Sequence, residues 1–127
     1  MGVKKLLLGL VTYGVFALLQ TAPVSAHHST TMFDMNKEIT ASGTVEAWQF
    51  VNPHSWLQVV VTDSEGNSMQ WSLETLGFPG IDLHKDSFRK GEKIAVIFNP
   101  MRNGRPAGIL LEALSESGQE WKFRYRQ

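Results

Sequence analysis

The chain contains no cysteine. Disulfide frameworks and thiolate zinc sites are therefore excluded, because both need thiols. An excess of charge of one sign is also missing, since 12 Lys and Arg residues balance 12 Asp and Glu residues in the 127-residue chain. A nucleic-acid-binding protein is not expected from this balance, because phosphate binding depends on clustered basic residues. The hydrophobic content of 43% argues against a disordered chain, and the length suits one small domain.

Common catalytic motifs are missing as well. The sequence has no Gly-x-Ser-x-Gly, no His-Glu-x-x-His, no phosphate-binding Walker loop and no Gly-x-Gly-x-x-Gly. The sequence therefore indicates no particular reaction. A binding or accessory role is favoured over an enzymatic one.

The N-terminus has the pattern of a cleavable export signal. Lys4 and Lys5 precede an apolar run at residues 6–19, which is too short for a transmembrane helix of about 20 residues. Val24 and Ala26 place small residues at the −3 and −1 positions of a cleavage site. We expect a Sec-type signal peptide over residues 1–26, cleavage after Ala26 and a periplasmic protein without a membrane span. A retained membrane anchor is the alternative.

The rest of the chain is predicted to be a short arm followed by one β domain. Residues 27–38 are polar without a clear period, which is typical of an extended arm. From Ile39 onward apolar and polar residues alternate with the period of a strand, and Gly43 indicates a bulge or bend. Six strands are expected, at residues 39–47, 55–62, 69–74, 92–98, 107–114 and 121–126.

The connection between the third and fourth expected strands carries helix signals. Asp86 could cap a turn at residues 87–90, and Gly91 could end it. Three strands, a short helical connection and then further strands is the element order of an OB-fold, a partly open Greek-key barrel. We therefore expect an all-β, OB-fold-like barrel of five to six strands over residues 39–127. An open sandwich or another small barrel is the alternative.

Histidine is the best metal ligand in a chain without cysteine. After cleavage His27 would be the first residue and would offer its α-amine and its imidazole Nδ1 to one metal ion. Such a nitrogen pair suits Cu(II), which heads the affinity order of divalent metals. His54 follows Pro53, which would hold it rigidly, so His54 is the expected third ligand of a histidine brace.

Further donors surround this predicted copper site. His28 could be a ligand or support one, and Glu74 is a carboxylate near a strand end. Met32 and Met35 on the arm could serve Cu(I). The alternative is structural: a solvated arm, a His54 that satisfies a turn, and methionines that only pack.

Aromatic residues suggest a second kind of site. Trp48 and Phe50 are out of phase with the apolar residues earlier in their strand, so together with Trp56 they could form an exposed platform. OB-folds use such faces to bind oligonucleotides and oligosaccharides. A ligand-binding or protein-interaction module of the cell envelope, without a metal, is therefore the alternative function. An envelope protein could also pair with the last expected strand.

Several short motifs together resemble a family of exported bacterial proteins known as a domain of unknown function. The motifs are His27-His28-Ser29, Gly43-Thr44-Val45, Asn52-Pro53-His54, Trp71-Ser72-Leu73-Glu74, Gly91-Glu92-Lys93-Ile94-Ala95-Val96, and the spacing of Pro100, Gly104 and Gly108. The resemblance covers nearly the whole mature chain. It implies export and a small β domain but no activity, and it places His27, His28, His54 and Glu74 in recurring motifs.

Overall fold

A computed structural model describes residues 30–51, 54–76 and 81–124 of the chain. The expected signal peptide, His27 and His28 lie outside these residues. A short 3-10 turn, η1 (Thr30–Met32), comes first, and six strands follow it. The strands are β1 (Ile39–Gln49), β2 (His54–Thr62), β3 (Ser68–Leu76), β4 (Lys93–Pro100), β5 (Ala107–Ser115) and β6 (Glu120–Lys122). The all-β prediction is confirmed.

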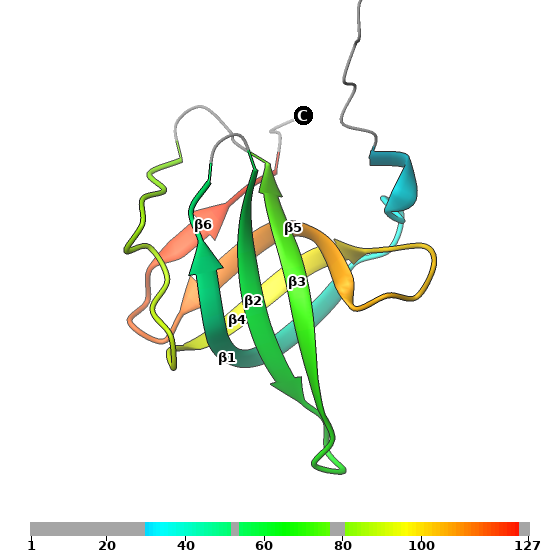
Figure 1. Cartoon of the computed structure of the whole chain (residues 1–127), viewed down its shortest axis with the longest axis horizontal. Helices are drawn as coiled ribbons and strands as arrows, with labels where there is room; N and C mark the ends of the chain where they lie inside the picture. Colours follow the sequence, from blue (N-terminus) through cyan, green and yellow to red (C-terminus); the bar gives the residue numbers. More distant parts are fainter. Residues whose placement is uncertain (1–29, 52–53, 77–80, 125–127) are drawn as a thin grey trace, which may run out of the picture.

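The first five strands form a closed barrel. Their order around it is β1-β2-β3-β5-β4, and β4 pairs with β1 to complete the ring. All pairings are antiparallel except the short one in which Ser72–Glu74 of β3 run parallel to Ala107–Ile109 of β5. This strand order is that of the OB-fold predicted from the sequence. β6 extends the sheet beyond β5 (Figure 1).

Strand β1 belongs to both sides of the barrel. Its first half, Ile39 to Thr44, pairs with β4, and its second half, from Thr44, pairs with β2. Gly43 lies at this change of partner, where an added Cβ would stand 2.4 Å from the carbonyl oxygen of Val60. A bulge between Val45 and Ala47 follows directly. The predicted bend at Gly43 is therefore confirmed, and the close approach of β2 explains why a glycine stands there.

The predicted helical turn at residues 87–90 is wrong. Within residues 81–92 the connection contains turns and bends but no helix. The Ser87 hydroxyl accepts a hydrogen bond from the His84 amide, and Phe88 is buried between Trp48 and Trp121. Ring centroids lie 4.9 Å apart for Phe88 and Trp48 and 4.4 Å apart for Phe88 and Trp121. Insertion of Phe88 into the core thus outweighs the local helix signals.

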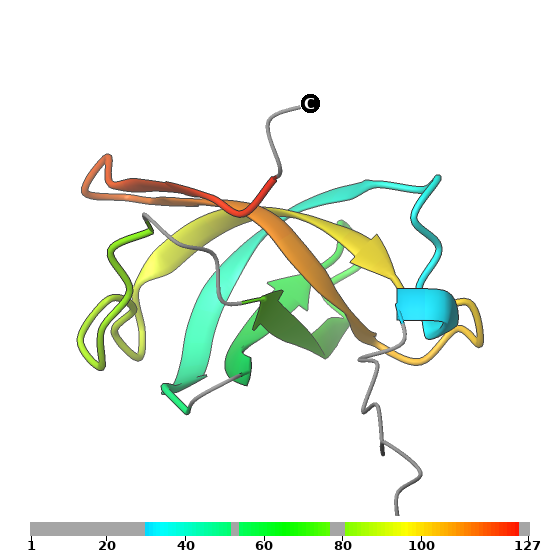
Figure 2. The ribbon, with the colours of Figure 1, turned by 90° about the horizontal axis from the view of Figure 1, so that it is seen from above.

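The core consists of inward-facing side chains from every strand. Trp121 and Phe98 are buried as predicted, and Trp71 packs half-buried against Phe98 with ring centroids 4.7 Å apart. The connection that carries Phe88 and the arm that carries η1 lie on opposite sides of the barrel (Figures 1 and 2). The connection and the arm therefore contribute to different surfaces of the barrel.

Candidate functional site

His54 and Glu74 meet on the outer face of the β2–β3 hairpin. His54 is the first residue of β2 and pairs with Leu76, while Trp56 pairs with Glu74. Directly opposed residues share one face of a sheet, so these four side chains lie on the same side. Nδ1 of His54 contacts the carboxylate oxygen Oε1 of Glu74, and the two side chains are only 18% and 15% exposed. The sequence named both residues, and the register of the hairpin brings them together.

A hollow of about 290 Å³ lies beside Glu74, and His54 adjoins it through its contact with this carboxylate. Glu74 contributes to its wall together with Trp56 and Leu76 from the hairpin. The other lining residues come from the arm, from the end of β4 and from β5; they are Thr30, Met32, Phe33, Met101, Ala107 and Ile109. The described part of the wall is mainly apolar, and among its described residues only Glu74 has an ionisable side chain.

The arm is held against the barrel at this hollow. Phe33 is 5% exposed and forms an isolated antiparallel bridge with Met101. The Asp34 amide donates to the carbonyl of Pro100 over 2.8 Å, and the Arg102 amide donates to the carbonyl of Met32 over 2.9 Å. The described part of the arm thus begins with the 3-10 turn η1 and docks through Phe33, where the sequence suggested an extended segment.

The structure separates the two methionines predicted as copper donors. Met32 lines the hollow, whereas Met35 is 47% exposed and does not contribute to its lining. Met101 lines the same hollow as Met32, and sequence reasoning missed it. Its place in the sequence, one residue beyond β4, carries no recognisable signal, because only the docking of the arm brings it beside Met32.

His27 and His28 lie outside the described residues. Thr30, the first described residue, lines the hollow and follows His27 by three positions in the sequence. Within residues 30–51, 54–76 and 81–124, His, Asp and Glu form no group of three that could hold a metal ion. Ligands from the arm would therefore be needed to complete a site at His54.

The aromatic residues predicted as a platform lie in different surroundings. Trp48 is half-buried, and its Nε1 donates to the carbonyl of His84 over 2.9 Å. Phe50 is exposed and its ring centroid lies 6.1 Å from that of Trp48. Trp56 instead lines the hollow. Trp48 pairs with Leu57, and Leu57 and Trp56 are neighbours in β2, so their side chains point to opposite faces of the sheet. Trp56 is thus separate from Trp48 and Phe50.

His84 has a local role in its turn. Its Nδ1 accepts a hydrogen bond from the Asp86 amide, and its own amide donates to Ser87 Oγ. It belongs to the connection over residues 81–92, which lies on the side of the barrel away from the arm (Figures 1 and 2). His84 is therefore a suitable control for experiments on His54.

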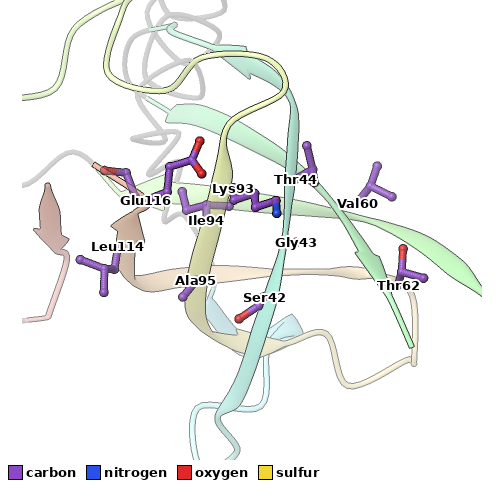
Figure 3. A pocket seen from close by; sticks show the side chains of 11 residues that line it. Ser42, Gly43, Thr44, Val60, Thr62, Lys93, Ile94, Ala95, Leu114 and Glu116 are labelled. Carbon is purple, nitrogen blue, oxygen red and sulfur yellow. The ribbon is translucent and has the colours of Figure 1, made fainter. Parts of the chain in front are cut away.

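A second hollow, of about 470 Å³, runs across the outside of β1 and β4 (Figure 3). Short side chains such as Ser42, Thr44 and Ala95 form its floor beside Gly43. Its described lining residues include neither histidine nor methionine. This groove is shallow because Gly43 and its small neighbours leave the bend of β1 uncovered.

Two basic residues near the end of the described chain, Lys122 and Arg124, are paired with carboxylates. Arg124 donates to both carboxylate oxygens of Glu38, over 2.7 and 3.1 Å, and to Glu112 over 2.6 Å. The hydrogen bond to Glu38 is the main cause of a raised pKa of Arg124. Lys122 pairs with Glu120 over 3.0 Å. Arg124, two residues after β6, thus links this end of the described chain to β5 and to Glu38, the residue before β1.

Comparison with known protein families now identifies the chain at the family level. The profile of DUF6152, a family of unknown function, matches residues 16–112. The chain belongs to this family. The match covers His27, His28, His54, Glu74 and Met101, and it confirms the resemblance to a domain-of-unknown-function family.

No curated protein and no solved structure matches the chain. Among the residues that the structure describes, no helix is long and apolar enough to cross a membrane.

Proposed function

We propose that this protein is exported to the periplasm and binds copper there, through the amino-terminal His27 of the processed chain and His54. The observation that carries the proposal is the contact of His54 with Glu74 beside a hollow walled by the start of the arm. His27 can contribute its α-amine and imidazole, and His54 a third nitrogen. This donor set suits Cu(II).

Glu74 supports His54 in the way that carboxylates support metal-binding histidines. A ligating histidine commonly donates its second ring N–H to a carboxylate, which orients the ring and raises its basicity. With Nδ1 of His54 on Glu74, a metal would be held through Nε2. His28 would lie next to the site in the sequence, as a further ligand or as a partner of one.

Cleavage of the signal peptide during export would expose the α-amine of His27, so cleavage and Cu(II) binding are tested together. The protein is exported under its own signal, and its mass is used to verify that it begins at His27. Cu(II) is titrated and followed by EPR, with a second sample that carries one extra Met before His27. We expect nitrogen-rich Cu(II) binding in the processed protein and its loss in the extended one. Equal weak binding in both samples would refute a site at the amino terminus.

Substitutions at the hairpin test the other half of the site. Glu74→Gln is expected to lower Cu(II) affinity by about 10- to 100-fold, as the loss of a supporting carboxylate commonly does. His54→Ala is expected to lower it at least as much, because it removes the ligand itself. His84→Ala, on the opposite side of the barrel, is the matched control. Unchanged affinity in His54→Ala would remove the basis of the proposal.

A ligand-binding or protein-interaction module of the cell envelope is the second candidate function. The observation that favours it is the mainly apolar hollow with Trp56 in its wall, which suits an apolar group of a small ligand or partner. This function predicts a change in tryptophan fluorescence on adding envelope extracts in the presence of a chelator. Loss of that change in Trp56→Leu, with metal absent throughout, would favour this candidate over copper binding.

A further inference from the structure

We infer that the hollow beside His54 is a Cu(I) site in which the thioethers of Met32 and Met101 join His54. The inference rests on the proposed function in one respect, because it assigns both copper oxidation states to the same histidine. It differs in its other ligands, which come entirely from residues that the structure describes. It therefore makes Cu(I) binding independent of His27.

The first support is that two methionines from distant parts of the sequence share one wall. The bridge between Phe33 and Met101 and the hydrogen bond from the Arg102 amide to the Met32 carbonyl hold the two segments side by side. Met101 is further fixed by its amide, which donates to the carbonyl of Ala107 over 2.9 Å. The docked arm and the barrel therefore place both methionines in the lining of one hollow.

The second support is the exposure of Met32. This side chain is 51% exposed although it lines an apolar hollow. A methionine that served only to fill the core would bury its side chain more completely. An accessible thioether beside a second thioether is instead the arrangement that a soft metal ion can reach.

The chemistry of the donors selects the metal. Thioether sulfur is a soft ligand that favours Cu(I), while imidazole binds copper in either state. Two thioethers and one imidazole are neutral, and Glu74 supplies one negative charge in the same wall to balance a monovalent cation. Glu74 acts here as a positioning residue through its contact with Nδ1 of His54.

The chain contains matched controls for this inference. Met35 lies on the same arm as Met32, and Met69 lies on β3; both are about half exposed, and neither contributes to the lining of the hollow. Met→Leu substitutions nearly conserve volume and are well tolerated. The four methionines therefore allow donor chemistry to be separated from exposure.

The experiment uses the processed protein labelled with ¹³C at the methionine methyl groups, and Ag(I) as a redox-inert substitute for Cu(I). We expect one equivalent of Ag(I) to shift the methyl signals of Met32 and Met101 and to leave those of Met35 and Met69 unchanged. Single Met→Leu variants assign the signals. The inference would be overturned if all four signals shifted in parallel, or if the Met32 and Met101 signals did not shift. Both outcomes are measured on the protein without substitutions, so they do not require every variant to fold.

Affinity measurements separate this inference from the proposed function. Cu(I) affinity is measured in competition with a chromogenic Cu(I) chelator. Met32→Leu and Met101→Leu are each expected to lower this affinity about tenfold or more. Met35→Leu, the control, should leave it unchanged. The protein with an extra Met before His27 should lose Cu(II) but keep Cu(I). If it keeps neither while the processed protein binds both, the Cu(I) assignment is refuted and the copper function stands.

Discussion

At the scale of single residues, the most informative contact is the one between His54 and Glu74. Each was recognisable in the sequence, His54 from the Asn-Pro-His turn and Glu74 from its place near a strand end. Their contact was not, because it depends on the register in which Trp56 lies opposite Glu74. A shift of this register by one residue would turn Glu74 to the other face.

Asp63 lies in the turn that sets this register. Among the described carboxyl groups, that of Asp63 has a clearly lowered pKa. Its Oδ1 accepts hydrogen bonds from the amides of Glu65 and Asn67, and its Oδ2 accepts one from the Asn67 side chain. The Asn67 side chain is the main cause of the lowered pKa of Asp63. The turn forms the tip of the projecting β2–β3 hairpin (Figure 1).

This pKa predicts how stability depends on pH. A lowered pKa means that folding favours the ionised carboxylate, so its contribution is present above the unfolded value of about 3.9 and is lost as the pH falls through the lower folded value. Asp63→Ala should therefore destabilise the protein more at pH 7 than at pH 2.5, by urea unfolding. The control is Asp82→Ala, at an exposed position of the β3–β4 connection. The same loss at both pH values would contradict the assignment.

At the scale of whole elements, β1 shows how one strand shapes the barrel. Gly43 is the residue at which the strand changes partners, and the missing side chain lets the backbone of Val60 approach. The period-two pattern predicted the strand and the glycine predicted its bend. The sequence predicted a bulge or a bend at Gly43, and the bulge lies slightly later, between Val45 and Ala47, because its position depends on how β2 pairs with the bent strand.

Gly43→Ala is expected to destabilise the fold by about 1–3 kcal/mol, the usual effect of an added carbon in a packed site. The new Cβ would stand 2.4 Å from the Val60 carbonyl oxygen and 2.7 Å from a methyl carbon of Val59, and neither the backbone nor the buried valine can move away easily. Equilibrium urea unfolding measures the change. Ser42→Ala, one residue earlier and exposed, should have little effect. Similar midpoints for both variants would show that β1 tolerates separation from β2.

At the scale of the whole molecule, docking of the arm on the barrel joins the fold to the candidate site. Phe33 is the buried contact, and it holds Met32 beside Met101 and Glu74. Phe33→Ala is expected to cost about 3 kcal/mol, near the lower end for a buried phenylalanine, because Phe33 lies outside the central cluster. The arm would then separate from the hollow.

Two measurements follow this separation in Phe33→Ala. The urea midpoint should fall, and Ag(I) should no longer shift the Met101 methyl signal in protein that is still folded. Met35→Ala, an exposed change on the same arm, should leave both measurements unchanged. A folded Phe33→Ala protein that binds Ag(I) as the wild type does would show that docking of the arm is not needed for the site.

Alternation of apolar and polar residues by itself determined where the six strands lie and the core positions of Phe98 and Trp121, because a period of two follows directly from strand geometry. The OB-fold-like order was inferred from the number and sequence of the elements, and the strand pairings confirm it without the expected helical turn. Local motifs also marked His54 and Glu74 as candidates. Tertiary structure decided the rest. It determined the pairing of β3 with β5, the contact of His54 with Glu74, and the presence of Met101 and Met32 in the lining of one hollow. It also determined that the connection around Phe88 forms turns and no helix, because Phe88 packs into the core. Each of these joins segments distant in sequence, and such contacts depend on register and packing, which no local pattern encodes.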